Sequence, residues 1–176
     1  AGFGLSVPYY WNIAPDLDAT LTPTVLSKRG AGLESEFRYL RPHWRGEING
    51  FWLPRDLTAG RDRWATRWTQ QGDLPDDVHY DWHLLRVSDD NYWKDGLRGA
   101  ESLTPRLLAS TAQAQQRRLL QVAGLGEVEQ HLYARLQQWQ VLQDTDPSTQ
   151  IAPPYQRTPQ IGALWSNRGG PLQWSL

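Results

Sequence analysis

The sequence contains no cysteine and no methionine among its 176 residues. Without cysteine, these residues can build neither a disulfide framework nor a thiolate metal site. Long apolar runs are also missing: there is no stretch of about 18 apolar residues, which excludes a transmembrane helix. Acidic and basic residues nearly cancel, 19 against 18, so no net field exists that would attract nucleic acid.

These absences leave room for a membrane protein that crosses the bilayer with strands. A spanning β-strand needs only about 9–11 residues, and only every second one must be apolar. The mean hydropathy of −0.63 is compatible with such strands. Aromatic residues are abundant, with ten tryptophans and seven tyrosines. Both residue types concentrate where a membrane meets water.

The two ends of the chain bear on whether it is complete. The start, Ala1–Gly4, has no basic residue and no apolar core after it, as a signal peptide would have. After Gly169-Gly170-Pro171, the residues Leu172–Leu176 are expected to begin another strand. We therefore expect the chain to be a fragment of a longer protein.

Alternating apolar and polar residues predict a series of strands in the first half of the chain. Turn signals such as Ala14-Pro15-Asp16 recur at intervals of roughly 10–15 residues, which is typical of an antiparallel meander. Pro42 and Pro54 are expected to end the third and fourth strands. The predicted strands are Leu5–Ile13, Leu17–Leu26, Leu33–Leu40, Glu47–Leu53, Arg61–Gln71 and Val78–Val87.

The polar faces of these strands carry charges of both signs, for example Glu34, Glu36 and Arg38. Such faces suit the wet lumen of a membrane barrel. A soluble, half-buried sheet shows the same alternation. The pattern therefore leaves three classes open: a membrane barrel, a soluble β-sandwich and a carbohydrate-binding module.

Local propensity is ambiguous from Ala100 to Asp144. Alanine, glutamine, arginine and leucine favour a helix, and Val128, Leu132 and Leu136 recur at a helical spacing. This reading gives a helical hairpin broken at Gly124-Leu125-Gly126. The alternative is a long β-hairpin, with strands Leu103–Gln121 and Glu127–Gln143. The residues alone do not decide between them.

Short motifs, in order along nearly the whole chain, resemble the LPS-assembly protein LptD family, also called the organic solvent tolerance family. The most specific block is Val7–Asp16, and it resembles the start of the LptD barrel. The matching residues in and after this block include Tyr9, Tyr10, Trp11, Asn12, Asp18, Arg29, Gly30, Glu36, Arg38 and Tyr39. Later matches are Arg86–Asp89 with Tyr92 and Asp95, Trp139–Asp144, and Pro153–Tyr155 with Arg157, Pro159 and Gln160.

The resemblance implies an all-β fold. The expected architecture is an antiparallel up-and-down meander that forms an incomplete part of a large transmembrane outer-membrane β-barrel. Residues 1–176 would be the first strands of that barrel domain, without the family's periplasmic domain and its closing strands. The resemblance also implies strands, not helices, in residues 103–143.

The resemblance further implies a translocon that inserts lipopolysaccharide into the outer leaflet of a Gram-negative outer membrane, not an enzyme. Its implied partners are lipopolysaccharide, outer-membrane lipid and the LptE lipoprotein that plugs the barrel. Components of the periplasmic Lpt bridge would bind through the missing domain. No cofactor is expected.

Two prolines, Pro8 and Pro23, lie inside predicted strands. Proline has no N–H to donate, so it belongs at strand edges or bulges. One interpretation is that each marks a bulge or a frayed strand end. The LptD resemblance implies another: these prolines weaken pairing beside the seam of first and last strands, where the barrel opens laterally.

Matching the apolar faces of the first two strands predicts their register. Pro8 then faces Thr22, so the two prolines lie on neighbouring rungs. Two missing donors would weaken this patch by about 0.5–1.5 kcal/mol per lost bond. The predicted pairs are Ile13 with Leu17, Trp11 with Ala19, Tyr9 with Leu21 and Val7 with Pro23.

Other clusters of polar residues invite chemical hypotheses. His79, Asp81 and His83 share one strand face, but same-face neighbours are about 7 Å apart, too far for one metal ion. We expect a solvated lumen wall there and no metal site. Glu36 with Arg38 is expected to be a lumen charge pair and not part of a glycosidase centre. Asp89–Gly99 is predicted to be a loop.

Overall fold

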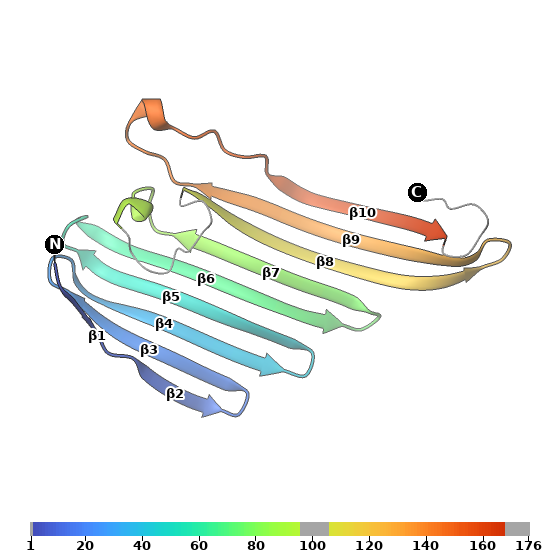
Figure 1. Cartoon of the computed structure of the whole chain (residues 1–176), viewed down its shortest axis with the longest axis horizontal. Coiled ribbons are helices and arrows are strands. Elements are labelled where there is room, and N and C mark those ends of the chain that lie inside the picture. Colours follow the sequence, from blue (N-terminus) through green and yellow to red (C-terminus); the bar gives the residue numbers. More distant parts are fainter. Residues whose placement is uncertain (1, 96–105, 168–176) are drawn as a thin grey trace.

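The computed structural model describes residues 2–95 and 106–167. They form one ten-stranded antiparallel sheet, in which β1 and β2 both pair with β3 and the later strands follow in chain order (Figure 1). No helix in these ranges is long and apolar enough to cross a membrane. The strands are β1 Gly4–Ser6, β2 Tyr9–Ala14, β3 Leu17–Leu26, β4 Gly30–Arg41, β5 Trp44–Asp56, β6 Arg61–Leu74, β7 Val78–Val87, β8 Leu107–Val122, β9 Gly126–Val141 and β10 Arg157–Asn167.

The predicted all-β, up-and-down meander is confirmed. Within the described ranges the sheet stays open, with β1 and β2 at one edge and β10 at the other, as expected for part of a barrel (Figure 1). Two short 3-10 helices, η1 (Tyr92–Asp95) and η2 (Pro147–Thr149), lie in the connections. No second sheet packs on this one among the described residues, which argues against a β-sandwich. The strand expected at Leu172–Leu176 lies outside the described residues.

The ambiguous middle segment is a β-hairpin. Strands β8 and β9 pair without interruption from Leu107 opposite Val141 to Val122 opposite Gly126. The helical interpretation is therefore wrong, because tertiary pairing overrides weak local propensity. Strands Leu17–Leu26 and Val78–Val87 have the predicted boundaries. Strand β10 was not predicted.

The expectation that Pro54 ends the fourth strand is wrong. Strand β5 continues to Asp56, and its pairing with β6 shifts register between Leu53 and Asp56. Arg55 has a positive φ of 51° at this point. A bulge of this kind accommodates a proline inside a strand, since one residue is left out of the ladder.

The register keeps apolar and polar residues on opposite faces of the sheet. We call these the apolar face and the charged face. One rung of the apolar face contains Trp11, Ala19, Phe37, Ile48, Trp68 and Leu84. The neighbouring rung of the charged face contains Asn12, Asp18, Arg38, Glu47, Thr69 and His83.

Four polar side chains on the apolar face hydrogen-bond to one another. The Tyr39 hydroxyl donates to Gln70 Oε1 at 2.6 Å and accepts from Trp68 Nε1 at 2.8 Å, while Gln70 Nε2 donates to the Tyr80 hydroxyl at 3.0 Å. Tyr39 lies across Gly46, where a Cβ would collide with its hydroxyl. An aromatic ring over a cross-strand glycine helps to hold the register.

The charged face becomes apolar at the end of the sheet that carries η1. Six apolar strand residues there are almost fully buried: Phe51, Leu53, Ala65, Leu85, Val87 and, on β8, Leu108. Tyr92 of η1 and Leu142, which follows β9, belong to the same cluster. The connections after β7 and after β9 therefore pack onto the sheet at this end.

Candidate functional site

Strands β1 and β2 form one interrupted strand, which we call the edge strand (Gly4–Ala14). Gly4 lies opposite Leu26 and Tyr9 lies opposite Leu21, so the same register holds on both sides of Val7–Pro8. The prediction of a continuous strand over Leu5–Ile13 is wrong, because pairing breaks at Val7–Pro8.

The predicted register of the edge strand is confirmed for Tyr9 with Leu21 and for Trp11 with Ala19. The predicted pair of Ile13 with Leu17 is wrong, because a bulge places Ala14 opposite Leu17 instead. Continuity of the register puts Pro8 opposite Thr22, as predicted.

The two prolines remove donors from different sides of the edge strand. Val7 N donates to the Pro23 carbonyl at 3.2 Å, so these residues form a hydrogen-bonded pair. Such a pair normally exchanges two bonds, and Pro23 cannot return the second. Pro8 lies in the alternate type of pair, so its nitrogen is directed away from β3. One donor, and not the expected two, is therefore lost between the edge strand and β3.

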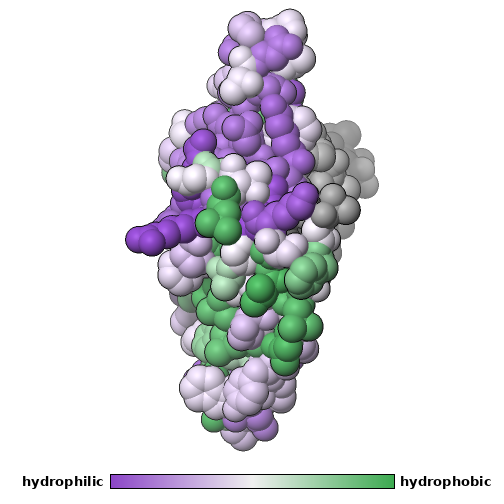
Figure 2. All heavy atoms as spheres, turned by 90° about the vertical axis from the view of Figure 1, so that its left-hand side faces the viewer, coloured by the Kyte–Doolittle hydropathy of each residue, from purple (hydrophilic) through white to green (hydrophobic). Residues whose placement is uncertain are grey.

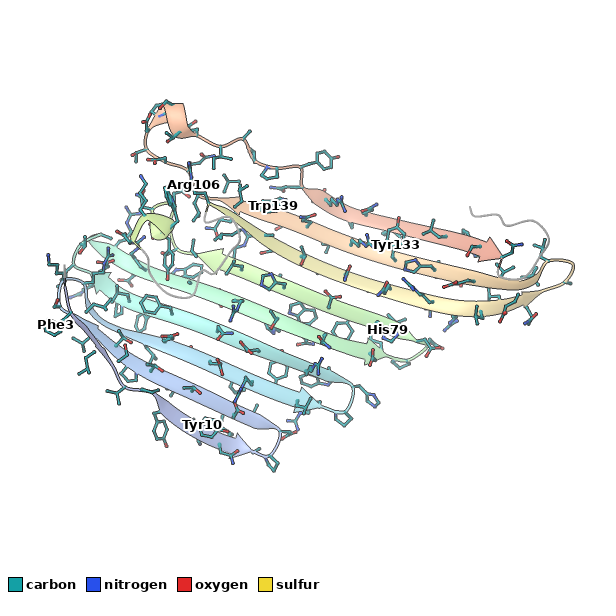
Figure 3. The ribbon with its side chains drawn as sticks, in the orientation of Figure 1. Phe3, Tyr10, His79, Arg106, Tyr133 and Trp139 are labelled. Carbon is teal, nitrogen blue, oxygen red and sulfur yellow. The ribbon has the colours of Figure 1, made fainter. Side chains whose placement is uncertain are left out.

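The edge strand is also exposed and apolar. Leu5, Val7 and Tyr9 are 63%, 60% and 62% exposed. Figure 2 shows hydrophobic side chains gathered over the lower part of this side of the molecule, and Figure 3 shows Phe3 and Tyr10 at its rim. Among the described residues β1 and β2 pair only with β3, which leaves their other side without a strand.

Other family-motif residues join β3 to β4 on the charged face. Arg38 donates to both carboxylate oxygens of Asp18, at 2.8 and 3.0 Å, from the neighbouring strand. The predicted pair of Glu36 with Arg38 exists at 3.4 Å, but Asp18 is the closer partner. Asn12 pairs with Asp18 along the backbone, and Gly30 begins β4 with a φ of 107°.

Five charged residues form a partly buried network that we call the ion-pair cluster: Arg29, Asp56, Arg63, Asp89 and Asp95. Arg29, in the β3–β4 turn, binds Asp56 at 2.6 Å and Asp95 at 2.7 Å. Arg63, at 0% exposure, binds both oxygens of Asp89 at 3.0 Å and also contacts Asp95. The cluster thus joins the β3–β4 turn, β5, β6 and the connection that follows β7.

The electrostatics of the cluster favour its charged form. Burial by itself would raise the pKa of Asp95, but hydrogen bonds from Arg29 and Arg63 outweigh it and lower that pKa. The Asp95 carboxylate in turn raises the pKa of Arg29. Of these residues, our sequence prediction had singled out Arg29, Asp89 and Asp95 but not Asp56 or Arg63. Arg63 follows the alternation of its strand as a polar-face residue, so the pattern gave no signal that it would be buried.

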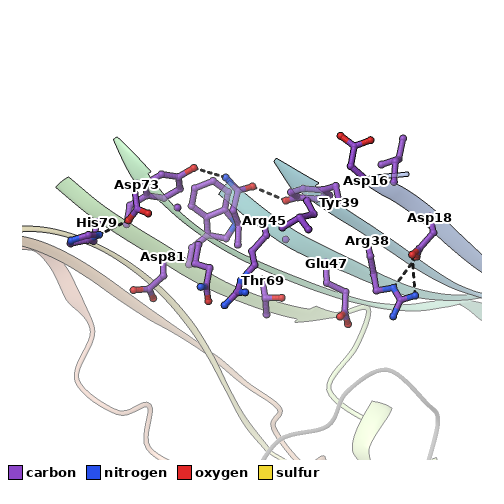
Figure 4. Close-up of a pocket in the computed structure, with 18 of the residues that line it drawn as sticks. Asp16, Asp18, Arg38, Tyr39, Arg45, Glu47, Thr69, Asp73, His79 and Asp81 are labelled. Atoms are coloured by element: carbon purple, nitrogen blue, oxygen red, sulfur yellow. Dashed lines mark hydrogen bonds and ion pairs between the residues drawn. The ribbon is translucent and has the colours of Figure 1, made fainter. Parts of the chain in front are cut away.

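The charged face is hollowed at the opposite end of the sheet. A hollow of about 860 Å³ is bordered by Arg38, Arg45, Glu47, Thr69 and Asp81, among others (Figure 4). Figure 4 shows these five side chains on the same side of the sheet. Acidic and basic groups alternate there, which suits a wetted wall better than a site for one ion.

The histidine pair of β7 lies at this end of the charged face. The ring of His79 contacts the Asp73 carboxylate, and Asp81 accepts from Gln113 at 2.7 Å. Within the described ranges, no group of three or more histidine or acidic residues is arranged to hold a metal ion.

Strands β7 and β8 separate near the buried end of the sheet, and two side chains bridge the gap. Their backbone pairing ends at His83 opposite Thr111. Beyond it, Ser110 Oγ accepts from Leu85 N and donates to Leu85 O, both at 3.2 Å. Gln140 accepts from Val87 N at 3.0 Å and donates to Val87 O at 2.8 Å.

Sequence reasoning missed this bridging, although Gln140 belongs to the family-like motif Trp139–Asp144. The same motif repeats the device with Gln143, which donates to Ile151 O at 2.8 Å and accepts from Ile151 N at 3.1 Å. An amide can satisfy both backbone groups of one residue, as a neighbouring strand would.

The chain is similar in sequence to proteins of one known family. The family described as "LptD: LPS transport system D" matches residues 61–173. The "LPS-assembly protein LptD" of Acidovorax sp. (strain JS42) is 42% identical over 98% of this chain. The chain belongs to the LptD family. The LptD relative from Bordetella pertussis (strain Tohama I) is 37% identical over 99% of the chain.

The chain spans only part of these LptD relatives. It covers 21% of the length of the Acidovorax protein and 21% of the Bordetella protein. The LptD resemblance drawn from short motifs is thus confirmed over nearly the whole chain, including the segment that forms β10.

Proposed function

We propose that this chain forms a wall of an outer-membrane translocon that inserts lipopolysaccharide into the outer leaflet. The relatives are LPS-assembly proteins by name, and the matching family is an LPS transport system. These names describe transport and assembly, not catalysis. The chain covers about a fifth of the relatives' length, so we propose that residues 1–176 are the first strands of a larger barrel domain.

The proposed location is the outer membrane of a Gram-negative cell. The apolar face would contact lipid, and the charged face would line the lumen. Support comes from the two neighbouring rungs through Trp11 and Asn12, which are apolar on one face and polar on the other from β2 to β7. The internally bonded cluster of Tyr39, Trp68, Gln70 and Tyr80 also suits a surface short of water.

The proposed route for lipid is a lateral opening on the free side of the edge strand. The observation that carries this proposal is the break at Val7–Pro8, where the edge strand keeps its register on β3 but lacks the backbone bond that Pro23 cannot donate. Pro8 deprives the free side of a donor, so pairing with a closing strand would be weaker there. Pro23 deprives the inner side of another.

The proposed partners follow from the family. Lipopolysaccharide would be the substrate, and the LptE lipoprotein would plug the barrel. The periplasmic Lpt bridge would bind outside residues 1–176. The charges of both signs on Arg38, Arg45, Glu47 and Asp81 would line part of the lumen that faces these partners.

The test is export by the full-length protein carrying Pro8→Ala with Pro23→Ala. We expect restored donors to strengthen pairing on both sides of the edge strand and to lower the amount of lipopolysaccharide at the cell surface. Pro54→Ala is the matched control, because Pro54 interrupts β5 away from the edge. Unchanged surface lipopolysaccharide in the double variant, at normal protein level, would refute a lateral opening at these prolines.

A further inference from the structure

The proposed lateral opening leaves one question that the geometry addresses: which strands move. The edge strand could swing outward alone, or β3 and β4 could swing with it. The answer depends on how firmly each strand is held to the next.

The edge strand is weakly held to β3. Its ladder is interrupted at Val7–Pro8 and shifted again before Ala14. The side-chain contacts across this seam that the structure records are neutral: Ser6 Oγ lies 3.0 Å from Thr24 Oγ1, and Ser27 Oγ accepts from Phe3 N at 3.1 Å. Within the described residues, no ion pair joins the edge strand to β3.

Strand β3 is firmly held to β4. Ten consecutive pairs run from Leu17 opposite Tyr39 to Leu26 opposite Gly30, without a register shift. The bidentate contact of Arg38 with Asp18 adds charged hydrogen bonds across the same pair of strands. Such bonds are stronger than neutral ones.

The end of the β3–β4 hairpin is anchored by the ion-pair cluster. Arg29 in its turn binds Asp56 and Asp95, and Leu57 N donates to the Arg29 carbonyl at 3.0 Å. Asp56 is fully buried, so moving Arg29 away would leave a carboxylate short of its nearest cation. The hairpin is therefore tied to β5, β6 and the connection carrying η1.

We infer that, when the barrel opens on the free side of the edge strand, the edge strand moves away from β3, while β3 stays in place on β4. This inference rests on the proposed function, since it assumes that the barrel opens beside the edge strand. The ion-pair cluster holds the β3–β4 hairpin to β5 and β6. The interrupted ladder at Val7–Pro8 is where the edge strand is free to move.

Two engineered disulfides test whether the edge strand moves alone or together with β3. Ser6→Cys with Thr24→Cys would link the edge strand to β3 at a directly opposed pair. Val25→Cys with Ala31→Cys would link β3 to β4 one rung away, also at a directly opposed pair. The alternation of the observed backbone bonds places both in the non-hydrogen-bonded type of pair, so the two links are matched. The 176 residues contain no cysteine of their own.

The experiment uses the full-length protein in its native membrane, oxidised with diamide and then reduced with dithiothreitol. We expect the link between residues 6 and 24 to abolish most lipopolysaccharide export, and reduction to restore it. The link between residues 25 and 31 should leave export close to that of the same variant when reduced.

Other outcomes overturn the inference in distinguishable ways. Loss of export with both links means that β3 moves with the edge strand. Normal export with both links, while Pro8→Ala with Pro23→Ala still impairs export, means that the edge strand stays on β3 and the opening lies elsewhere at the seam. Normal export in all three variants would refute the proposed lateral opening itself.

Discussion

Two places in this sheet lose backbone hydrogen bonds between neighbouring strands, and only one of them has side chains that replace the lost bonds. At the edge, Pro23 cannot donate to the Val7 carbonyl, and within residues 2–95 and 106–167 no side chain replaces that bond. Between β7 and β8, pairing fails beyond His83, but Ser110 and Gln140 satisfy the exposed backbone groups of Leu85 and Val87. The gap at the edge therefore stays without a bond, whereas the gap between β7 and β8 is bridged by side chains.

The difference follows from what surrounds each gap. Leu85 and Val87 belong to the buried cluster, at 2% and 3% exposure, where an unpaired N–H or C=O is costly. The edge strand is exposed, so its unpaired groups cost little in the described sheet. A buried gap must be bridged for the sheet to be stable, whereas an exposed gap can be kept available for movement.

The largest effect on stability is expected from breaking the ion-pair cluster, which lies at the same end of the sheet as the bridged gap. Arg63→Met leaves the buried Asp56 and Asp89 carboxylates short of a cation, which we expect to destabilise the folded protein by about 3–5 kcal/mol. Urea unfolding in detergent, followed by tryptophan fluorescence, measures this. Arg67→Met on the same strand is the control, since that side chain is partly exposed and should cost well under half as much.

The next effect is expected from removing the bridge between β7 and β8. Gln140→Ala leaves the Val87 N–H and C=O without their partner, at a cost of about 1–3 kcal/mol for each group that water does not reach. Amide exchange at Val87 should accelerate. Gln138→Ala, which removes only an exposed contact with Arg86, is the control. Equal exchange at Val87 in the two variants would mean that the bridge is dispensable.

A smaller effect of opposite sign is expected at the edge. Pro23→Ala supplies the donor that the Val7 carbonyl lacks and should stabilise the edge strand by about 0.5–1.5 kcal/mol. Pro8→Ala adds a donor on the other side and should leave pairing with β3 nearly unchanged. Amide exchange over residues 4–14, compared between the single variants, checks this. Similar protection from both changes would contradict the assigned bond directions.

The smallest effect is expected from the pair of Lys94 with Asp144, at 2.6 Å, which ties η1 to the segment after β9. A hydrogen bond from Lys94 lowers the pKa of Asp144 from 3.8 to about 2. Because this pKa is depressed in the folded state, its stabilisation is present above pH 3.8 and is lost as the pH falls toward 2. Asp144→Asn should therefore reduce stability slightly above pH 3.8, with the difference vanishing near pH 2 in parallel acid titrations of both proteins. A constant difference across that range would mean that the pair does not act through charge.

Much of the edge strand could be predicted from the residues. Apolar matching placed Tyr9 opposite Leu21 and Trp11 opposite Ala19, because facing strands must present the same face. The same matching failed at Ile13, where a bulge adds a residue that no alternation reveals. The residues of β8 and β9 resisted prediction for another reason: their propensities favour a helix, and only their pairing with each other and with neighbouring strands makes them strands.

The sequence by itself determined the class of fold, the two faces of the sheet, the family and the positions of its unusual prolines. These depend on residue types and their order, which act locally or by period two. Only the tertiary structure decided which donor each proline removes, which carboxylates Arg63 meets and how Gln140 reaches Val87. Those outcomes depend on side chains brought together from distant parts of the chain, where register and burial select the partners.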